Sequence, residues 1–379
     1  MKIKTKGALF SALIITSLMI LALSVSFTGP ASALPDSLTP HDPIHIDGNA
    51  GFIAANGVVA GSGTAGDPYI IANWVISAEN AHGIEIESTT AYFIIRNCLV
   101  ENGDPSWLSF IGIYLENVVN GKIENCTCDN NLRGIGLERY SNNNIISNSI
   151  MENNYDYGIY LGDSDNNIIS NNTCSNNAYG IYLYSSDNNI ISNSIMENNS
   201  SGIELSSSWA YSSYNTISNC IIKNGIFVVG CYNLIFNNLL ENSSISLPHV
   251  YPENAPQVVN NRIYHNNFIN IVASDGGTNY WDNGYPSGGN YWSDYTGADN
   301  YRGMNQDIPG SDGIGDTPHN IPFMLNPSGP NRDRYPLMAP WTPSWAPPEE
   351  APTRWPLIAG IVGVIVVIGI VAAVYMRRR

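Results

Sequence analysis

Residues 158–205 read GIYLGDSDNNIISNNTCSNNAYGIYLYSSDNNIISNSIMENNSSGIEL. The phrase Gly-Ile-x-Leu occurs three times in this stretch, beginning at Gly158, Gly180 and Gly202, so that successive copies lie 22 residues apart. A repeat of this length is too long for one helical turn or one hairpin. It is typical of a solenoid, in which each turn of the chain stacks on the turn before it.

A second phrase interleaves with the first over most of the chain. Its isoleucine is followed two residues later by asparagine, or by histidine in the last copy, and a second asparagine comes five residues after that. The isoleucines are Ile95, Ile123, Ile146, Ile169, Ile191, Ile217, Ile235 and Ile263. The second asparagines are Asn102, Asn130, Asn153, Asn176, Asn198, Asn224, Asn242 and Asn270. Across both phrases the period ranges from 18 to 29 residues.

The Gly-Ile-x-Leu phrase predicts a short strand with one buried face, because its apolar residues lie two apart. Related copies begin at Gly83, Gly112, Gly134 and Gly225. One turn then holds two or three strands joined by corners of Asn, Gly and Ser. Asparagine at a corner can hydrogen-bond to neighbouring backbone and adopt left-handed dihedral angles. A column of asparagines can also bond from turn to turn.

Stacked turns lie about 4.8 Å apart, so that isoleucine packs on isoleucine. Each buried isoleucine contributes about 2 kcal/mol. A leucine-rich repeat would need a helix-forming half in every unit, and segments such as Asn142–Asn144 are poor helix formers. We therefore predict an all-β fold, a parallel β-helix of about eight or nine turns. The rule for parallel crossover connections makes it right-handed.

The two ends of the chain predict a membrane protein. Three lysines in the first six residues precede an apolar run, and Ala31-Ser32-Ala33 resembles a cleavage site. These features predict a secretory signal peptide, with an uncleaved anchor as the alternative. A second apolar run, Leu357 to Met376, is 20 residues long and could cross about 30 Å of hydrocarbon as a helix. Three terminal arginines would then stay in the cytoplasm, with the body outside the cell.

We expect seven segments along the chain. They are a signal peptide at 1–33, an N-terminal cap with the first strands at 34–82, the β-helix coils at 83–272, a C-terminal cap rich in Trp, Tyr, Gly and Asp at 273–338, a proline-rich stalk at 339–356, a transmembrane helix at 357–376 and a cytoplasmic tail at 377–379.

The charge of the body limits its ligands. All 32 acidic residues lie between positions 34 and 356, together with 10 of the 16 basic residues, which gives 10 − 32 = −22. Such a charge argues against nucleic acid or acidic polymers as partners. Two of the six cysteines, Cys98 and Cys126, occupy equivalent positions in adjacent turns, within range of a disulfide. The alternative is that most cysteines are small buried apolar residues.

Several motifs resemble a known group. Gly61-Ser62-Gly63-Thr64 followed by Asp67-Pro68-Tyr69-Ile70-Ile71, the Asn-Asn-x-Ile coils, Gly289-Asn290-Tyr291-Trp292-Ser293-Asp294-Tyr295 and Asp312-Gly313-Ile314-Gly315-Asp316-Thr317-Pro318 are similar to segments of archaeal NosD-type right-handed β-helix proteins. The resemblance covers roughly residues 44 to 338. It implies the class of carbohydrate-binding and sugar-hydrolase repeats. It also implies kinship with a periplasmic accessory protein of copper-site maturation, although the C-terminal span and the scattered His and Met residues depart from that role.

Two sets of residues could bind a ligand. In the C-terminal cap, Asp307, Asp312 and Asp316 lie among glycines, and hard oxygen ligands on a sharply turning chain suit Ca²⁺. The alternative is a loop whose aspartates bond to backbone. On the strands, the variable residue of Gly-Ile-x-Leu points outward. The outward aromatic residues and nearby carboxylates predicted to bind a glycan are Tyr114, Tyr160, Tyr182, Tyr184, Asp163, Asp165 and Asp187. The alternative is that stacked tyrosines only cover the sheet.

Metal binding and catalysis have less support in the sequence. His41 and His45 lie four residues apart near the mature start, a weak pattern for copper or zinc. No pair of carboxylates has a spacing that indicates polysaccharide cleavage, so no catalytic residue is predicted. We therefore expect a non-enzymatic surface module that binds glycans or envelope proteins. A polysaccharide lyase or hydrolase and a copper accessory protein are the alternatives.

Overall fold

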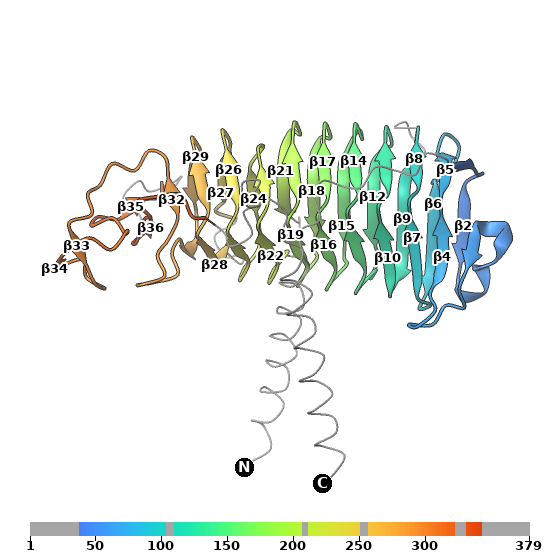
Figure 1. The fold of residues 1–379 in the computed structure, drawn as a ribbon, viewed down its shortest axis with the longest axis horizontal. Coiled ribbons are helices and arrows are strands. Elements are labelled where there is room, and N and C mark those ends of the chain that lie inside the picture. Colours follow the sequence, from blue (N-terminus) through green and yellow to red (C-terminus); the bar gives the residue numbers. More distant parts are fainter. Residues whose placement is uncertain (1–37, 104–109, 207–210, 251–256, 323–330, 343–379) are drawn as a thin grey trace, which may run out of the picture. The chain divides into compact units, whose positions relative to one another are not determined.

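The computed structural model describes residues 38–103, 110–206, 211–250, 257–322 and 331–342. Within these ranges the chain forms three long parallel sheets wound as a solenoid (Figure 1), and its helices are the short 3-10 helices η1 (Asn49–Gly51) and η2 (Ala54–Asn56). No helix of the described ranges is long and apolar enough to cross a membrane. The expected signal peptide, transmembrane helix and cytoplasmic tail lie outside them, as does nearly all of the expected stalk.

Each sheet takes one strand from every turn, and its strands pair in parallel except for the first two strands of sheet C, which pair antiparallel. Sheet A contains β1 (Thr39–Pro40), β5 (Trp74–Ser77), β8 (Leu99–Glu101), β11 (Thr127–Asp129), β14 (Ile150–Glu152), β17 (Thr173–Ser175), β20 (Ile195–Glu197), β23 (Ile221–Ile222), β26 (Leu239–Glu241), β29 (Asn267–Ile269) and β32 (Tyr291–Trp292). Sheet B contains β2 (Ile44–Asp47), β6 (Ile84–Thr89), β9 (Ile111–Val118), β12 (Arg133–Glu138), β15 (Tyr157–Gly162), β18 (Tyr179–Tyr184), β21 (Ser201–Ser206), β24 (Ile226–Val228), β27 (Ser244–Leu247) and β30 (Val272–Asp275). Sheet C contains β3 (Val58–Ala60), β4 (Tyr69–Ala72), β7 (Phe93–Arg96), β10 (Gly121–Glu124), β13 (Ile145–Ser147), β16 (Ile168–Ser170), β19 (Ile190–Ser192), β22 (Thr216–Ser218), β25 (Leu234–Phe236), β28 (Val259–Tyr264) and β31 (Thr278–Tyr280).

The chain passes from sheet C to A to B in each turn. Strands β4 to β30 number 27, and three strands per turn give nine complete turns, as predicted. The prediction of one isoleucine file is also confirmed, because all eight isoleucines align in sheet C and are buried. Ile71 on β4 adds a ninth member to that file.

The sequence analysis gave the corner asparagines two roles, a left-handed backbone and hydrogen bonds from turn to turn. In the structure different residues fill these two roles. The predicted second asparagines are mostly left-handed: Asn102, Asn130, Asn153, Asn176, Asn198, Asn242 and Asn270 have φ between 49° and 64°. The ladder consists mainly of the next residue along the chain. We call it the Asn131 ladder; its members are Asn131, Asn154, Asn177 and Asn199, and it ends at Asn224, a predicted second asparagine that accepts the backbone N–H of Asn199. The first four members therefore lie one residue after the predicted column, because a side chain at a left-handed corner points outward and the following one points in.

Each ladder residue binds the turn before it. The Asn154 side-chain oxygen accepts the backbone N–H of Asn131 at 3.1 Å, and its nitrogen donates to the Cys128 carbonyl at 3.1 Å. The corner between sheets B and C carries a similar ladder, the Asn144 ladder, formed by Asn144, Asn167, Asn189, Asn215, Asn233, Asn261 and Asn279. Polar groups at these corners are thus paired although they are buried.

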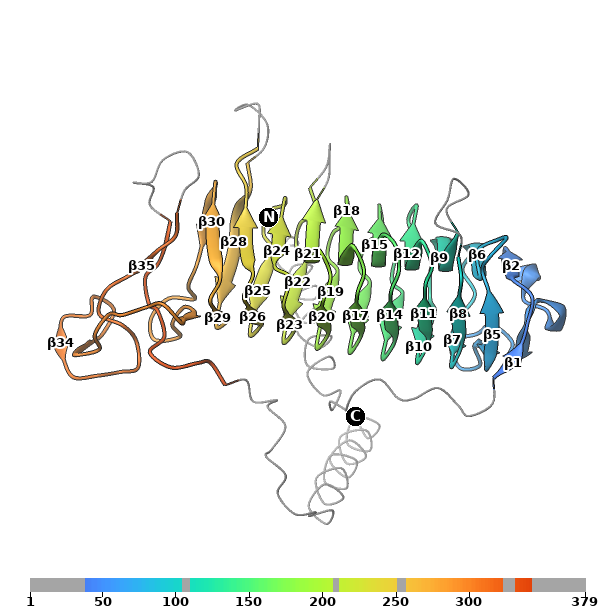
Figure 2. The same ribbon diagram turned by 90° about the horizontal axis from the view of Figure 1, so that it is seen from above.

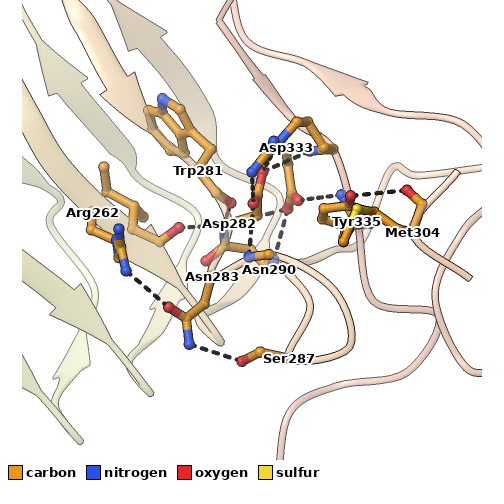
Figure 3. A network of polar contacts seen from close by, with 12 residues as sticks. Arg262, Trp281, Asp282, Asn283, Ser287, Asn290, Met304, Asp333 and Tyr335 are labelled. Atoms are coloured by element: carbon orange, nitrogen blue, oxygen red, sulfur yellow. Dashed lines mark hydrogen bonds and ion pairs between the residues drawn. The ribbon is translucent and has the colours of Figure 1, made fainter.

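Buried carboxylates end the ladders in the C-terminal cap. A third ladder, at the corner between sheets C and A, includes Asn238, Asn266 and Asn290. Asp333 accepts a hydrogen bond from the backbone of Asn290 at 2.7 Å (Figure 3). It accepts another from the Trp292 indole at 2.9 Å. Asp275 accepts one from the side chain of Asn279 at 2.7 Å. A carboxylate offers only acceptors when ionised, so it suits the end of a stack that leaves donors unpaired. Two short antiparallel pairs complete the cap: β33 (Tyr301–Arg302) with β34 (Ile308–Pro309), and β35 (His319–Asn320) with β36 (Arg332–Asp333).

The six cysteines are free thiols in the structure. Cys98 and Cys126 do lie in adjacent turns, and a hydrogen bond joins their side chains. Five of the six, all except Cys231, are buried. This arrangement agrees with the alternative that cysteines serve here as small core residues.

Replacing Asn177 by Ala tests the ladder. The change leaves buried groups of Asn154 and the Met151 carbonyl without partners, so we expect the free energy of unfolding to fall by about 1–3 kcal/mol for each orphaned group. Chemical denaturation followed by circular dichroism measures it. The control is Asn176→Gly, at an exposed left-handed position that glycine adopts readily. Equal stability of the two variants would contradict the role of the ladder.

Asp333 should give the cap a distinctive pH dependence. Burial raises its pKa to about 7, whereas the pKa of aspartate in an unfolded chain is about 3.9. Between these values the folded protein retains a proton that the unfolded chain has released, so stability should fall as pH rises from about 4 to about 7 and then level off. Denaturation midpoints across this range measure the fall. Asp333→Asn should flatten the profile, and an unchanged slope would refute this assignment.

Candidate functional site

The strands of sheet B run along one side of the solenoid (Figure 2), and their outward side chains form the candidate site. Strand alternation places isoleucine and leucine inward and the residues between them outward. Two outward columns result. The first is His45, Glu85, Tyr114, Gly136, Tyr160, Tyr182, Glu204 and Phe227. The second is Asp47, Glu87, Glu116, Glu138, Gly162, Tyr184 and Ser206. One end of the face is therefore acidic, and the middle is aromatic.

A pocket of about 380 Å³ opens at the acidic end, over β6, β9 and β12. Its polar lining consists of His82, Glu85, Glu87, Glu116, Arg133 and Glu138. Tyr114, Ile111 and Leu132 supply the rest of the wall. A concave site with a few convergent polar groups on a rigid scaffold is the usual form of a small-ligand site.

Two of the four carboxylates in this pocket are already paired. The Tyr114 hydroxyl donates to Glu116 at 2.5 Å, and Arg139 donates to the other oxygen of Glu116 at 2.6 Å. Burial acts to raise the pKa of Glu116, but these two hydrogen bonds outweigh it and hold the pKa below its usual value. Arg133 forms an ion pair with Glu138 at 2.5 Å. Both carboxylates are therefore held in place by their partners.

The other two carboxylates are not satisfied in this way. A carboxylate oxygen of Glu87 lies 3.7 Å from Nε2 of His45, and the side chain of Glu85 forms no hydrogen bond or ion pair with another of the described residues. Burial, with Glu87 and Glu116 nearby, raises the pKa of Glu85, and His45 opposes that rise. Ligand atoms of His45, Glu85 and Glu87 all lie within 4.8 Å of one another. The pocket thus holds negative charge that the protein itself does not neutralise.

His82 lies at the edge of the pocket as a neutral side chain. Its Nδ1 accepts the backbone N–H of Ile111 at 3.0 Å, which places the proton on Nε2. Burial lowers the pKa of His82, and the positive charges of Arg133 and His45 lower it further. The ring stacks on Tyr114 at a centroid distance of 4.9 Å. His82 can therefore donate one hydrogen bond, but its acceptor nitrogen is occupied.

Aromatic rings continue the face beyond the pocket. We call Tyr157, Tyr160, Tyr179 and Tyr182 the tyrosine cluster. The Arg133 guanidinium lies 4.3 Å from the centre of the Tyr160 ring, and Tyr160 stacks on Tyr182 at 5.9 Å. Burial and the Glu138 charge raise the pKa of Tyr160 to about 12, so its hydroxyl stays protonated. Arg133 therefore connects the pocket to the tyrosine cluster.

The structure brings together some of the predicted glycan-binding residues and separates others. Tyr114, Tyr160 and Tyr182 share one column, and Tyr184 follows on β18 in the next. Asp165 and Asp187 lie instead at the corner between sheets B and C, where each accepts a backbone N–H of the next turn at 2.7 Å. Asp163 is exposed at the start of that corner.

The predicted calcium residues act on the backbone of the cap. Asp312 accepts hydrogen bonds from Ile314 and Gly303, and Asp316 accepts them from Asn300 and Tyr301. Asp307 is exposed. Within the described residues, the group of three that could hold a metal lies on sheet B and not in this cap. Calcium at the cap stays a prediction.

The residues that the sequence analysis missed are His82, Glu85, Glu87, Glu116, Arg133, Glu138, Tyr157 and Tyr179. A signal for them existed. Positions two residues before or after the variable residue of Gly-Ile-x-Leu share its face in a strand. Extending the outward column in both directions would have found Glu87, Glu116 and Glu138. The pairing of Glu116 with Arg139, one turn away, had no such signal.

Comparisons place the chain among known proteins. A family model described as "Periplasmic copper-binding protein (NosD)" matches residues 45–211 and 208–297, more than half of the chain. A search of the curated proteins found no match.

Solved structures show similarity in fold. An alginate lyase from Paenibacillus sp. is 17% identical, with a TM-score of 0.47 over 66% of this chain and 98% of its own. A periplasmic alginate epimerase is 15% identical, with a TM-score of 0.43 over 64% and 60%. A mannuronan C-5 epimerase module from Azotobacter vinelandii is 14% identical, with a TM-score of 0.34 over 64% and 70%. On the strength of the family model, which matches more than half of its residues, the chain belongs to the NosD family.

Proposed function

We propose that this protein is a cell-surface, membrane-anchored module that binds glycans along the outer face of sheet B. The observation that carries the proposal is the tyrosine cluster beside a polar pocket on one rigid face. Aromatic rings provide flat apolar area for the faces of sugar rings. Carboxylates, Arg133 and the Nε2–H of His82 provide acceptors and donors for hydroxyl groups.

The rigidity of the face favours binding. Its side chains stand on strands that are paired on both sides, so little conformational freedom is lost when a ligand binds. The contacts of Arg133 with Glu138 and with Tyr160 also fix its guanidinium before any ligand arrives.

The pocket favours a binding role over hydrolysis. Glycoside hydrolysis requires two carboxylates that are free to act as acid and as base or nucleophile. Glu116 and Glu138 are both held by cations, and the acceptor nitrogen of His82 is occupied. Of the four pocket carboxylates, the side chain of Glu85 has no hydrogen bond or ion pair with a described residue, and that of Glu87 faces His45 alone. These two lie beside His45, an arrangement that suits the binding of a positively charged group.

The location outside the cytoplasm is supported by sequence. Residues 1–33 have the pattern of a secretory signal, and the apolar segment 357–376 could anchor the body by a single C-terminal span. The family description as periplasmic agrees with a body on the outer side of the cytoplasmic membrane.

Replacing Tyr160 or Tyr182 by Ala should weaken glycan binding about tenfold or more, because each change removes a stacking surface. Glycan arrays identify a ligand, and isothermal titration measures the affinity. The matched control is Tyr264→Ala, since Tyr264 stacks in the same manner on Phe236 on the outer face of sheet C. An affinity unchanged by the sheet B variants, or the absence of any glycan ligand, would contradict the proposal.

A metal-binding role is the second candidate, and the group of His45, Glu85 and Glu87 favours it. One imidazole and two carboxylates suit a divalent ion bound by nitrogen and oxygen. Cu(I) prefers thiolate and thioether ligands, and five of the six thiols are buried in the core. The ligand set of this group therefore favours a divalent ion over Cu(I).

Equilibrium dialysis with Cu²⁺, Zn²⁺ and Ca²⁺ tests the metal candidate. His45→Ala should weaken binding about tenfold or more, as loss of metal-supporting contacts does elsewhere. His41→Ala, four residues away, serves as the control. If both variants bind like the unmodified protein, the ion does not occupy this group.

A further inference from the structure

One outward position of sheet B beside the pocket carries no side chain, because it is a glycine. Gly136 stands in a column between Tyr114 and Tyr160, where neighbouring turns carry large side chains. Its φ is not left-handed, and an added Cβ would lie 3.5 Å from both Ile111 and Tyr114, an ordinary contact distance. Neither backbone conformation nor packing therefore requires glycine here. The glycine leaves one outward position without a side chain between two tyrosines, with Ile111 and Tyr114 beneath it; we call this position the notch.

The notch adjoins the pocket. Two residues that line the pocket, Ile111 and Tyr114, are also the nearest to an added Cβ at Gly136. Arg133, which also lines the pocket, lies over the Tyr160 ring. A ring lying across the notch would have Tyr160 on one side and the pocket carboxylates on the other. The tyrosine cluster and the pocket thus form one continuous surface on adjacent turns.

The negative charge of the pocket favours sugars that carry a positive group over neutral or acidic sugars. Its lining carries four glutamates and one arginine, and His82 is neutral, so the formal charge is 1 − 4 = −3. Uronate, sulfate and phosphate groups would be repelled. A neutral hydroxyl could bond to Glu85 but would leave its charge uncompensated. A primary ammonium group has three donors and one positive charge, which matches the unpaired Glu85 and the weakly paired Glu87.

We infer that the pocket binds the ammonium group of a free amino sugar, while the adjoining tyrosine cluster binds the neighbouring rings of the same glycan. Glu85 and Glu87 accept the ammonium hydrogen bonds, and Gly136 leaves room for the amino-bearing ring. The inference rests on the glycan-binding role proposed above and names the class of ligand for that site.

Isothermal titration of the full chain in detergent, with EDTA present, compares three oligosaccharides of equal length. They are glucosamine oligomers, their N-acetylated counterparts and galacturonate oligomers. We expect the glucosamine oligomer to bind about tenfold or more tightly than the N-acetylated one, the size of a charge-assisted hydrogen bond. The galacturonate oligomer should bind most weakly.

Two variants assign the preference to the pocket. Glu85→Gln should remove the preference for the free amine, so that the glucosamine oligomer binds no more tightly than the acetylated one. Its matched control is Glu204→Gln, since Glu204 is a half-buried carboxylate in the same column but outside the pocket lining. Gly136→Leu should fill the notch and weaken binding of both the glucosamine and the N-acetylated oligomers, with an unchanged circular dichroism spectrum.

The outcomes separate this inference from the proposed function. If the amino and acetylated oligomers bind equally and Tyr160→Ala weakens both, glycan binding stands and the ammonium site is refuted. If no oligosaccharide binds, both fail. If binding requires a divalent ion in place of EDTA, a metal occupies the carboxylates and the inference is wrong. A preference for the amine that survives Glu85→Gln also overturns it.

Discussion

Buried side-chain amides at the corners hold this structure together. A strand pairs its backbone with the turns on either side, but a corner bends away and leaves N–H and C=O groups inside the stack. The ladder asparagines bind both kinds of group in the preceding turn, as Asn154 does with the backbone of Asn131 and Cys128. Without them, every turn would bury unpaired polar groups at a cost comparable to the gain from its isoleucine.

The interior constrains the sequence, whereas the outer faces are free to vary. The inward positions of sheet B are isoleucine, leucine or valine in most turns, while one outward column runs through glutamate, tyrosine, glycine and phenylalanine. Variation on a fixed framework is how the same fold can present different surfaces. On sheet B it places an acidic pocket beside a tyrosine cluster and holds both in fixed positions.

Periodicity was sufficient to predict the solenoid, its nine turns and its isoleucine file, because each depends on contacts between equivalent positions. The corner ladder was predicted one residue before its true position, because the repeat alone does not tell which of two consecutive asparagines points inward. Tyr114, Tyr160 and Tyr182 were predicted from strand alternation, whereas Tyr157 and Tyr179 were missed. Asp165 and Asp187 could not be separated from them, because both lie near the tyrosines in sequence and only the corner geometry directs them elsewhere. The pairing of Glu116 with Tyr114 and Arg139 depends on side-chain conformations that no repeat encodes.

The ladders also have a direction. Every ladder amide points its oxygen toward the N-terminal neighbour, so a stack ends in unpaired backbone donors at its C-terminal side only. There Asp333 receives the backbone N–H of Asn290, and Asp275 receives the side-chain amide of Asn279. Because each rung contacts just its two neighbours, a copy of one unit could be inserted or lost in mid-stack with every donor still matched. Family members of different lengths could then arise by duplication of single units, while the terminal carboxylates stay where they are.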